Sequence, residues 1–431
     1  MKTKNDKPAL IPRLRFPEFQ NNGEWEVTNL GLVSDYENGK AHEQDIEDIG
    51  DFIVVNSKFI SSNGEVKKYT NTAFCPAQKG DILMVLSDVP NGKAIAKCFL
   101  VEENNRYTVN QRIGRIIPQS LNSKILYYLL NRNPYLLAFD DGVKQTNLRK
   151  EDVLNCPLLI PKNPKEQQKI ASCLSSLDEV IAGERQRLEL LKAHKKGLLQ
   201  NLFPREGETV PKLRFPEFKD SGKWEVKIIG EIGETINGLT NKSANDFGKG
   251  SPFITYLQVY EDSMVNLDKC SFVNIELNEK QNTIHKGDIL ITTSSETPDE
   301  VGFASVMLNE PAQDTYLNSF CFCLRPHKKA NLLPEFSRYL FRSNFYRIQI
   351  NKIAQGITRF NLSKQSFLKV LLLIPPLPEQ QKIADCLSSL DELINAQQQK
   401  IELLEQYKKG LLQGLFPNLK QLDNERSNYD I

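Results

Sequence analysis

The sequence predicts an α+β fold: two mixed α/β heads, joined by two long helices that form an antiparallel coiled coil with pseudo-two-fold symmetry. Three observations predict this fold. The chain repeats itself with a period of about 200 residues. The most similar part of the repeat carries a heptad pattern of apolar residues, which is typical of a coiled-coil helix. The remaining parts alternate short apolar runs with Gly, Asn and Pro, which is typical of strands and turns.

The repeat has the size of a whole domain. Residues 12–19 (PRLRFPEF) return as residues 211–218 (PKLRFPEF), and residues 166–204 return as residues 379–417 with 27 of 39 positions identical. Solenoid units repeat every ~20–50 residues, so this period is too long for a solenoid. A chain of 431 residues also exceeds the ~250–300 residues at which a single core stops growing. The sequence therefore predicts a tandem duplication of one module.

Composition excludes several classes of protein. The charged N-terminus leads to no apolar segment, and apolar runs such as residues 370–374 are far shorter than the ~20 residues that span a bilayer. Eight cysteines in a chain of this length do not indicate a disulfide framework. We therefore expect a cytoplasmic protein without a membrane segment. The net charge of +1 does not support nucleic-acid binding, so that function has to rest on local features.

The pattern divides the chain into five segments. Residues 1–162 form the first head, 163–204 the first helical region, 205–376 the second head, 377–417 the second helical region, and 418–431 a polar C-terminal tail. Within the heads, apolar runs predict strands at residues 52–55, 81–85 and 288–291. Helices are expected at residues 123–137 and 334–350.

The two helical regions carry matching seams with spacings of three and four residues. Polar residues fall at the same places in both, Glu184 with Gln397 and Lys195 with Lys408. An amphipathic helix packed on its own head is the alternative, but two equal seams in one chain favour mutual pairing. Because only a short linker follows the first helix, the second begins near the end of the first, which predicts antiparallel helices. The seam residues are Leu174, Leu177, Ile181, Leu188, Leu191, Leu198, Leu387, Leu390, Ile394, Ile401, Leu404 and Leu411.

No sequence motif for catalysis is present. The chain has no phosphate-binding Gly-rich loop ending in Gly-Lys-Ser/Thr, and its four histidines are scattered. Cys321 and Cys323 lack the companion pair that a zinc site needs. The Asn133-Pro134-Tyr135 triplet has no Gly-rich cofactor loop upstream, and we interpret it as a helix or turn boundary. We expect no catalytic residue, no metal and no cofactor in this chain.

Polar loops recur in both heads within a shared frame. Lys-Gly-Asp-Ile-Leu precedes a polar loop in each head, residues 142–148 parallel 356–362, and residues 110–112 stand opposite 318–320. Their Lys, Arg, Gln and Asn side chains are of the kinds that pair with base edges and phosphates. Ordinary surface turns are the alternative. The candidate DNA-binding residues are Ser87, Asn91, Lys93, Gln111, Arg112, Lys144, Gln145, Asn147, Ser294, Ser295, Thr297, Thr358, Arg359 and Asn361.

These segments resemble the specificity subunit of type I restriction–modification enzymes. The resemblance rests on residues 12–19 and 211–218 with the Trp-Glu pairs that follow, on Lys-Gly-Asp-Ile-Leu, and on the Glu-Gln-Gln-Lys-Ile-Ala that opens each helical region. It covers nearly the whole chain and implies two target-recognition domains, each of which reads one half of a bipartite asymmetric site in double-stranded DNA. It also implies a helical rod that sets the spacing and docks two methyltransferase subunits.

The resemblance implies a non-catalytic subunit of an adenine-specific DNA methyltransferase and site-specific endonuclease complex. Partner subunits would bring S-adenosylmethionine for methylation, and restriction/translocase subunits would bring ATP and Mg. Two alternatives stay open at the level of the residues. One is a non-enzymatic scaffold with two protein-binding heads on a coiled-coil spacer. The other is a self-contained enzyme with a divergent active site.

Overall fold

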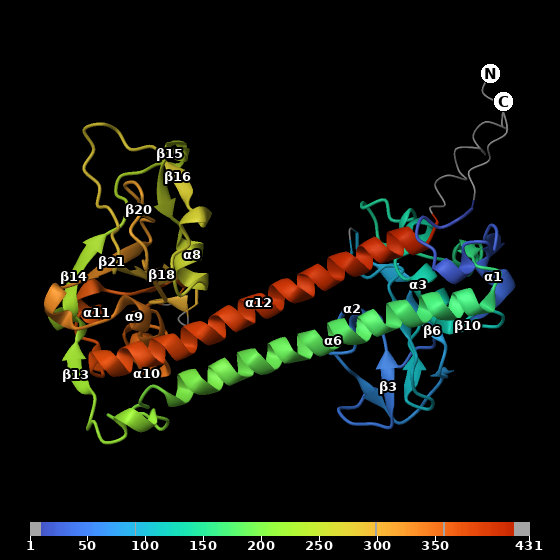
Figure 1. The fold of residues 1–431 in the computed structure, drawn as a ribbon, viewed down its shortest axis with the longest axis horizontal. Coiled ribbons are helices and arrows are strands. Elements are labelled where there is room, and N and C mark those ends of the chain that lie inside the picture. The colour runs from blue at the N-terminus through green and yellow to red at the C-terminus, as the bar shows by residue number, and fades with distance from the viewer. Residues whose placement is uncertain (1–9, 91, 298–299, 357, 418–431) are drawn as a thin grey trace. The chain divides into compact units, whose positions relative to one another are not determined.

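The computed structural model describes residues 10–90, 92–297, 300–356 and 358–417. The chain divides into two compact units, Met1–Glu184 with Lys400–Ile431, and Arg185–Gln399 (Figure 1). Each unit combines one head with a part of both long helices, because the boundaries between units fall inside these helices. The tail predicted at residues 418–431 lies outside the described residues.

The heptad repeats form two long helices, α6 (Pro164–Asn201) and α12 (Leu377–Leu415), of 38 and 39 residues. All twelve predicted seam residues are buried or half-buried. That they form the seam of a coiled coil stays a prediction. In the part of the chain that the structure describes, no helix is sufficiently long and apolar to cross a membrane.

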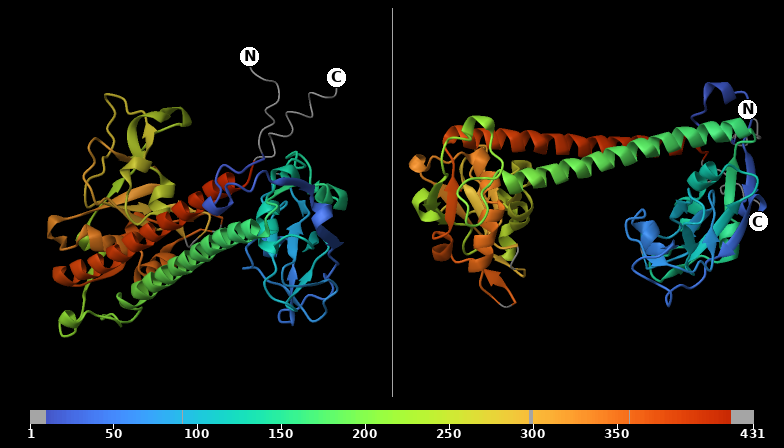
Figure 2. Two further views of the ribbon diagram at one scale, coloured as in Figure 1. Left: turned by 45° about the vertical axis from the view of Figure 1, so that its right-hand side comes forward. Right: turned by 90° about the horizontal axis from the view of Figure 1, so that it is seen from below.

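The two helices run antiparallel within the first unit. Lys408 of α12 donates a hydrogen bond to Asp178 of α6, and Lys400 donates to Glu184 at 2.5 Å. Residue numbers along α12 therefore decrease as those along α6 increase, so the two helices run in opposite directions here. Views from two further sides also show these parts of α6 and α12 side by side (Figure 2).

The second unit repeats the same contact with the roles of the helices exchanged. Lys195 of α6 forms an ion pair with Asp391 of α12. In the repeat, Lys195 corresponds to Lys408 and Asp391 to Asp178, in both cases with an offset of 213 positions. A tyrosine from each head completes the arrangement: the hydroxyl of Tyr128 donates to Asp178, and that of Tyr339 donates to Asp391, both at 2.7 Å. In each unit, the aspartate thus joins both helices to the head, since it binds a lysine of the other helix and a tyrosine of the head.

Among the described residues, the first head contains two four-stranded sheets, of order β2-β10-β6-β8 and β4-β3-β9-β5, and the two-stranded ladders β1-β12 and β11-β7. Its strand pairs are antiparallel except β3 with β9. The strands are β1 (Glu26–Asn29), β2 (Ser34–Asn38), β3 (Phe52–Val55), β4 (Tyr69–Thr70), β5 (Pro76–Ala77), β6 (Ile82–Val85), β7 (Ser87–Asp88), β8 (Cys98–Leu100), β9 (Tyr107–Val109), β10 (Ile113–Pro118), β11 (Thr146–Asn147) and β12 (Pro157–Ile160). The helices are α1 (Leu30–Val33), α2 (Ser57–Ser61), α3 (Ser123–Leu130), α4 (Pro134–Leu137) and α5 (Lys150–Leu154).

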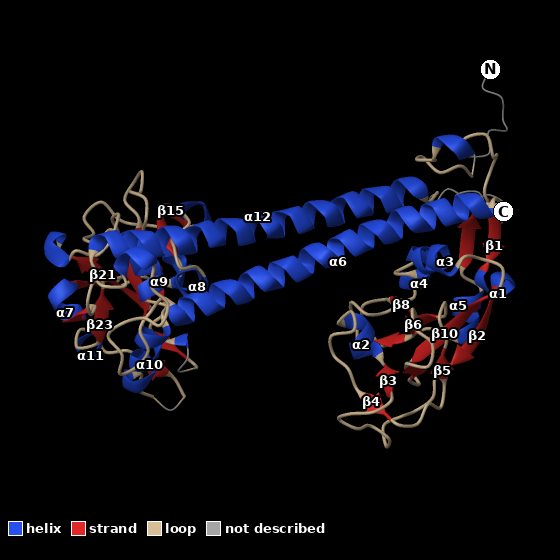
Figure 3. Cartoon of the chain, turned by 60° about the horizontal axis from the view of Figure 1, so that its bottom comes forward, coloured by secondary structure: helices blue, strands red, loops and turns tan. Residues whose placement is uncertain are grey.

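The second head follows the same plan among its described residues, with a sheet of order β14-β21-β17-β19, a three-stranded sheet β16-β15-β20, and the ladders β13-β23 and β18-β22. Again one pair, β15 with β20, is parallel. The strands are β13 (Glu225–Ile228), β14 (Gly233–Asn237), β15 (Phe247–Ile254), β16 (Ser271–Val273), β17 (Ile289–Thr292), β18 (Ser294–Ser295), β19 (Ala304–Val306), β20 (Tyr316–Leu317), β21 (Cys321–Pro326), β22 (Phe360–Asn361) and β23 (Leu371–Ile374). The helices are α7 (Ile229–Ile232), α8 (Tyr256–Glu261), α9 (Pro334–Leu340), α10 (Asn344–Ile353) and α11 (Lys364–Phe367). Figure 3 shows helices and strands mixed in both heads.

The segments predicted as single helices each form two shorter ones. In the first head the break lies at Asn133, whose side chain accepts a hydrogen bond from the Tyr135 N–H at 2.9 Å and donates to the Leu129 carbonyl at 2.8 Å. Pro134 then opens α4, at a position where a helix leaves the N–H unpaired in any case. In the second head the Ser343 hydroxyl caps α10 in a similar way. The predictions at residues 123–137 and 334–350 therefore missed a local side-chain cap in each head.

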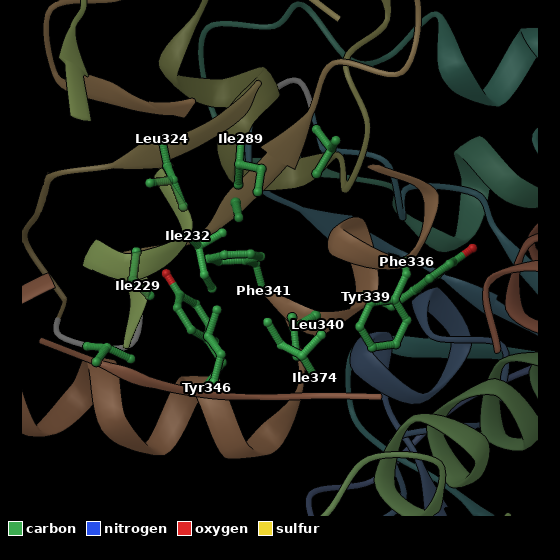
Figure 4. Packing of buried hydrophobic residues seen from close by; sticks show 14 of the residues in the cluster. Ile229, Ile232, Ile289, Leu324, Phe336, Tyr339, Leu340, Phe341, Tyr346 and Ile374 are labelled. Carbon is green, nitrogen blue, oxygen red and sulfur yellow. The ribbon is translucent and has the colours of Figure 1, made fainter. Parts of the chain in front are cut away.

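The apolar core of each head extends onto the ends of the long helices. In the second unit, Phe336 stacks on Phe203 just beyond the end of α6, with ring centroids 5.6 Å apart. Figure 4 shows the same cluster deeper in the head, where Ile229, Tyr346 and Phe341 pack together. In the first unit the ring of Trp25 packs edge-on against Phe416, just beyond the end of α12, with ring centroids 6.0 Å apart. Burial of these side chains fixes each head on its portion of the helices.

The repeated segments 12–19 and 211–218, which we call the first and second hook, join the start of one long helix to the end of the other. In the first unit Arg15 binds the carboxylate of Glu166, in the first turn of α6, through Nε at 2.7 Å and Nη2 at 2.9 Å. Its Nη1 donates to the Gly23 carbonyl at 2.6 Å. The adjacent Leu14 N–H donates to the carbonyl of Gly414, near the end of α12, at 2.8 Å.

The second hook makes the same contacts with the helices exchanged. Arg214 binds Glu379, in the first turn of α12, through two hydrogen bonds of 2.7 Å, and also the Gly222 carbonyl at 2.6 Å. Leu213 N–H donates to the carbonyl of Asn201, the last residue of α6, at 2.8 Å. Each unit therefore fixes the register between the two helices with its own hook.

An indole completes each buried carboxylate site. Trp25 Nε1 donates to Glu166 at 3.3 Å, and Trp224 Nε1 donates to Glu379 at 3.2 Å. The side chains of both glutamates are 1% exposed. A buried charge is tolerated only with a matched partner and saturated hydrogen bonds. This requirement explains why the hooks, the tryptophans and the helix openings recur nearly unchanged.

Candidate nucleic-acid interface

In the first head, the three polar loops identified in the sequence converge on one buried residue, Leu86, between β6 and β7. The Leu86 N–H donates to the Arg112 carbonyl at 3.0 Å, and the Leu148 N–H donates to the Leu86 carbonyl at 2.8 Å. Strand β11 then pairs with β7, so that Asn147 lies opposite Ser87. We call the surface formed by Ser87, Gln111, Arg112, Gln145 and Asn147 the first face.

In the second head, the corresponding loops form the same main-chain hydrogen bonds around Thr293. The Thr293 N–H donates to the Phe320 carbonyl at 2.9 Å, and the Leu362 N–H donates to the Thr293 carbonyl at 2.8 Å. Asn361 of β22 lies opposite Ser294 of β18. The surface formed by Ser294, Ser295, Phe320, Arg359 and Asn361 is called the second face. The two faces share a main-chain frame and differ in their side chains.

A glycine permits the close approach behind each face. A Cβ atom at Gly39 would lie 2.1 Å from the Asn110 carbonyl oxygen, and one at Gly238 would lie 2.2 Å from that of Asn318. Real Cβ atoms do not approach so closely, so a side chain at either glycine would push the loop out of place. The frame of the faces thus depends on glycine at the same position in both heads.

Several candidate side chains of the first face are held in place by one another. Gln145 Nε2 donates to the Ser87 hydroxyl at 2.8 Å and to Asn147 Oδ1 at 3.3 Å. Gln111 Nε2 donates to Glu43 at 3.1 Å. Hydrogen bonds, first from its own backbone N–H and then from Asn110, hold the pKa of Glu43 below its ordinary value, so this carboxylate remains an acceptor.

The loop that carries Lys93 is organised by Asp88. This carboxylate accepts from the N–H groups of Val89, Ala94 and Ile95 at 2.9, 2.7 and 3.1 Å. Lys93 itself is exposed, and the predicted contact Asn91 lies outside the described residues. The loop is therefore anchored on the strand that forms the first face.

Exposed side chains dominate the remaining candidate positions. Arg112 and Lys144 of the first head, and Thr297, Thr358 and Arg359 of the second, are all exposed. Arg359 lies with its Cζ atom 5.2 Å from the centre of the Phe320 ring, and Phe320 is 50% exposed. These residues present cations, hydroxyls and an aromatic ring to solvent.

The serine candidates are placed differently. Ser87, Ser294 and Ser295 are less than one-tenth exposed, and the Ser295 hydroxyl donates to Glu300 at 2.5 Å. The structure therefore uses the Ser87 and Ser295 hydroxyls to hold neighbouring groups. Direct contact between the three serines and a ligand stays a prediction.

Two lysines that the sequence patterns did not single out occupy equivalent places beside the faces. Lys150, two residues after Leu148, has its Nζ 5.9 Å from the centre of the Tyr36 ring. Lys364, two residues after Leu362, has its Nζ 5.6 Å from the Phe322 ring and donates to Asn237. The signal in the sequence was a lysine at the same offset from the shared Asn-Leu pair in both heads.

The described residues include all eight cysteines, and most of the His, Asp and Glu side chains that could bind a metal ion. Within them, no three His, Cys, Asp or Glu side chains come together in a way that could hold a metal ion. All eight cysteines are free thiols, and burial raises the pKa values of Cys321 and Cys323 well above that of an ordinary thiol. These thiols are consequently poor nucleophiles and poor metal ligands at neutral pH.

Comparison with known proteins gives one consistent result. The family model described as "Type I restriction modification DNA specificity domain" matches residues 22–193 and again residues 221–406. The type I restriction enzyme MjaVIII specificity subunit of Methanocaldococcus jannaschii is 23% identical over 413 residues, covering 93% of this chain and 92% of that protein.

Two solved structures have the same fold. The crystal structure of the S subunit of a type I restriction–modification system from M. genitalium matches with a TM-score of 0.57 at 18% identity, over 95% of this chain and 99% of that one. A structure of a type I restriction–modification system, determined to explain complex assembly and conformational transition, matches with a TM-score of 0.56 at 18% identity, over 91% and 98% of the two chains.

Proposed function

The chain belongs to the family of type I restriction–modification DNA specificity domains, and we propose that it is the sequence-specificity subunit of a type I complex. Each head reads one half of a bipartite, asymmetric site in double-stranded DNA, and the base pairs between the halves remain unread. The chain is proposed to act as the non-catalytic subunit of this complex. The target-recognition domains are the two heads, at residues 1–162 and 205–376.

The observation that carries this proposal is the convergence of three divergent loops on equivalent residues, Leu86 and Thr293. Main-chain hydrogen bonds to these residues are the same in both heads, whereas the exposed side chains around them differ. Arg, Lys, Gln and Asn side chains distinguish base pairs in the major groove. Two domains that recognise different DNA sequences require a shared main-chain arrangement and different side chains on it.

The long helices are proposed to form an antiparallel coiled coil with pseudo-two-fold symmetry, which sets the spacing of the half-sites. The equivalent contacts Lys408–Asp178 and Lys195–Asp391 support this arrangement. Because one turn of B-DNA is ~34–36 Å long, the length of the spacer limits which half-site separations are possible. Lengthening the helices by whole turns is expected to lengthen the unread gap.

The same helices are proposed to dock two methyltransferase subunits, and through them the restriction subunits. Apolar residues are exposed at equivalent positions of α6 and α12: Val180 matches Leu393, and Leu190 matches Leu403, with exposed fractions of 48, 55, 63 and 65%. Exposed apolar groups commonly mark interaction sites. Identical surfaces in a two-fold frame bind two copies of one partner, which would account for one methylation on each strand.

Chemistry is assigned to the partners. The methyltransferase subunits are proposed to bring S-adenosylmethionine for adenine methylation, and the restriction/translocase subunits to bring ATP and Mg. The complex is proposed to act in the cytoplasm. The net charge of +1 suggests that these partners also supply much of the contact with DNA phosphates, since basic proteins normally provide it.

Selection from randomised duplexes tests the proposal. The complete complex, with its methyltransferase subunits, is expected to enrich a motif with two specified halves and an unspecified gap. The alternative is a scaffold whose heads bind proteins, and it predicts no enriched DNA sequence. A random pool of bound duplexes from an active complex would overturn the proposed function.

A further inference from the structure

We propose that Arg359 recognises a guanine in the half-site of the second head, and that Phe320 holds the guanidinium in the orientation for this contact. The inference rests on the proposed function and adds the identity of one recognised base. It also predicts that the first head, which has a glutamine at the corresponding place, does not require a guanine there.

Arg359 lies between two residues, Gln355 and Asn361, that are joined by main-chain hydrogen bonds. The Gln355 N–H donates to the Asn361 carbonyl at 3.1 Å, and the Asn361 N–H donates to the Gln355 carbonyl at 2.8 Å. Gly356 has φ +153°, and a Cβ atom there would lie 2.0 Å from the Arg359 carbonyl oxygen. Position 356 therefore requires glycine, and this glycine allows the backbone of Arg359 to lie close to it.

Phe320 supplies the second constraint. Its carbonyl accepts from both the N–H and the hydroxyl of Thr293, at 2.9 and 2.8 Å, so the residue is anchored beside β18. Its ring is half exposed, and the Arg359 Cζ lies 5.2 Å from its centre. A cation over an aromatic face is attracted by the electron density of the ring. The ring thus restricts the guanidinium without consuming its hydrogen-bond donors.

Those donors remain available for a ligand. Within the described part of the chain, no carboxylate or carbonyl accepts a hydrogen bond from the Arg359 guanidinium. Guanine presents two acceptors, O6 and N7, on its major-groove edge, which match the paired donors of arginine. Adenine presents one acceptor and one donor there, so the same arginine discriminates against it.

The first head carries a different pair at the equivalent places. Gln145 stands where the second head has Arg359, and Arg112 stands where it has Phe320. The amide nitrogen of Gln145 donates to Ser87 at 2.8 Å, which leaves its carbonyl oxygen as the free acceptor. An acceptor at this position does not match the two acceptors of guanine. The first head is therefore a control within the same chain.

The test uses the complete complex and maps methylated sites in cellular DNA, first for the unaltered chain and then for Arg359→Gln. We expect the unaltered motif to contain a guanine in the second half-site whose replacement by another base weakens binding roughly tenfold to a hundredfold. Arg359→Gln is expected to abolish that preference at one position and to leave the first half-site unchanged. Gln145→Ala, the matched control, is expected to change only the first half-site.

Binding to synthetic duplexes identifies the contact itself. Replacing the guanine with 7-deazaguanine, which lacks the N7 acceptor, is expected to weaken binding of the unaltered complex but not of the Arg359→Gln complex. Phe320→Ala is expected to relax the guanine preference, and Phe320→Trp, which keeps an aromatic face, is expected to retain it. Equal weakening on all sequences, with a smaller salt dependence, would identify Arg359 as a phosphate contact and overturn the inference.

The two levels of failure are distinguishable. If the unaltered complex marks no bipartite motif, the proposed function is wrong. If it marks one and Arg359→Gln leaves both halves unchanged, the function stands and this inference is wrong.

Discussion

Arg15 and Glu166 form a buried, bidentate ion pair between residues 151 positions apart in the sequence. The side chains are 6% and 1% exposed. The pair connects the first hook to the opening turn of α6, and the neighbouring Leu14 connects the same hook to the end of α12. The hook therefore links the antiparallel pairing of the helices to the position of the first head.

Glu166→Gln is expected to destabilise the first unit by about 3–5 kcal/mol, because it leaves the Arg15 charge buried without its partner. The measurement is the shift in the denaturant midpoint of unfolding. The control is Glu18→Gln in the same hook. Glu18 pairs with Lys169, but both side chains are about half exposed, and such pairs contribute little. Equal midpoints for the two variants would show that the buried pair does not hold the unit together.

Asp391→Ala is expected to cost more stability than Asp178→Ala, although the two residues are equivalent. Asp391 accepts from Arg338 at 2.9 Å as well as from Tyr339 and Lys195, whereas Asp178 accepts from Tyr128 and Lys408. Hydrogen bonds to charged groups contribute roughly 1.5–3 kcal/mol each.

Unfolding free energies of the two variants, measured in parallel with the unaltered chain, provide the comparison. An equal loss in both variants would mean that the additional contact with Arg338 is not formed in solution.

Stability is expected to fall above pH 10 partly through Tyr128. Burial, and then the hydrogen bond to Asp178, raise the pKa of this phenol above its ordinary value of 10.0. Its contribution is therefore fully present below pH 10, and it is lost at higher pH as the unfolded chain ionises first. Tyr128→Phe removes the ionisable phenol, so the unfolding free energy of this variant should decline less steeply from about pH 9 to about pH 11 than that of the unaltered chain. Parallel curves for the two proteins would contradict the assignment.

Lys150→Ala and Lys364→Ala are expected to weaken DNA binding about equally on all sequences. These lysines recur at the same place beside the two faces, and a group that is the same in both heads suits the sequence-independent phosphate backbone. Each substitution should reduce the slope of log binding constant against log salt by about one. A change in the preferred bases, with an unchanged slope, would instead place these lysines among the base contacts.

The sequence was sufficient to predict the long helices because heptad periodicity is a local signal. Leu174 and Leu387, for example, were assigned to the seam from spacing alone, and both are fully buried in clusters that also contain residues of the heads. The role of Arg15 could not be predicted, because its partner lies 151 positions away and no periodicity connects them. The matching tryptophans and hooks were visible as repeats, but their common purpose required the fold.

The candidate site was predictable in part. Residue type and the shared frame pointed to the loops that contain Gln145 and Arg359, but not to their convergence on Leu86 and Thr293, which depends on strand pairing. Burial of the serines was missed for the same reason. Phe320 was overlooked because an isolated aromatic residue carries no sequence signal until the cation that lies over it is known.

The most direct test of the account is a methylation map of cellular DNA from cells that express the methyltransferase partners with either the unaltered chain or a chain whose first head is replaced by a copy of the second. We predict a bipartite motif for the unaltered chain. For the replaced chain we predict a motif in which only one half changes, so that the two halves become the same sequence in opposite orientations. A change in both halves, or an unchanged motif, would contradict the claim that each head reads one half-site.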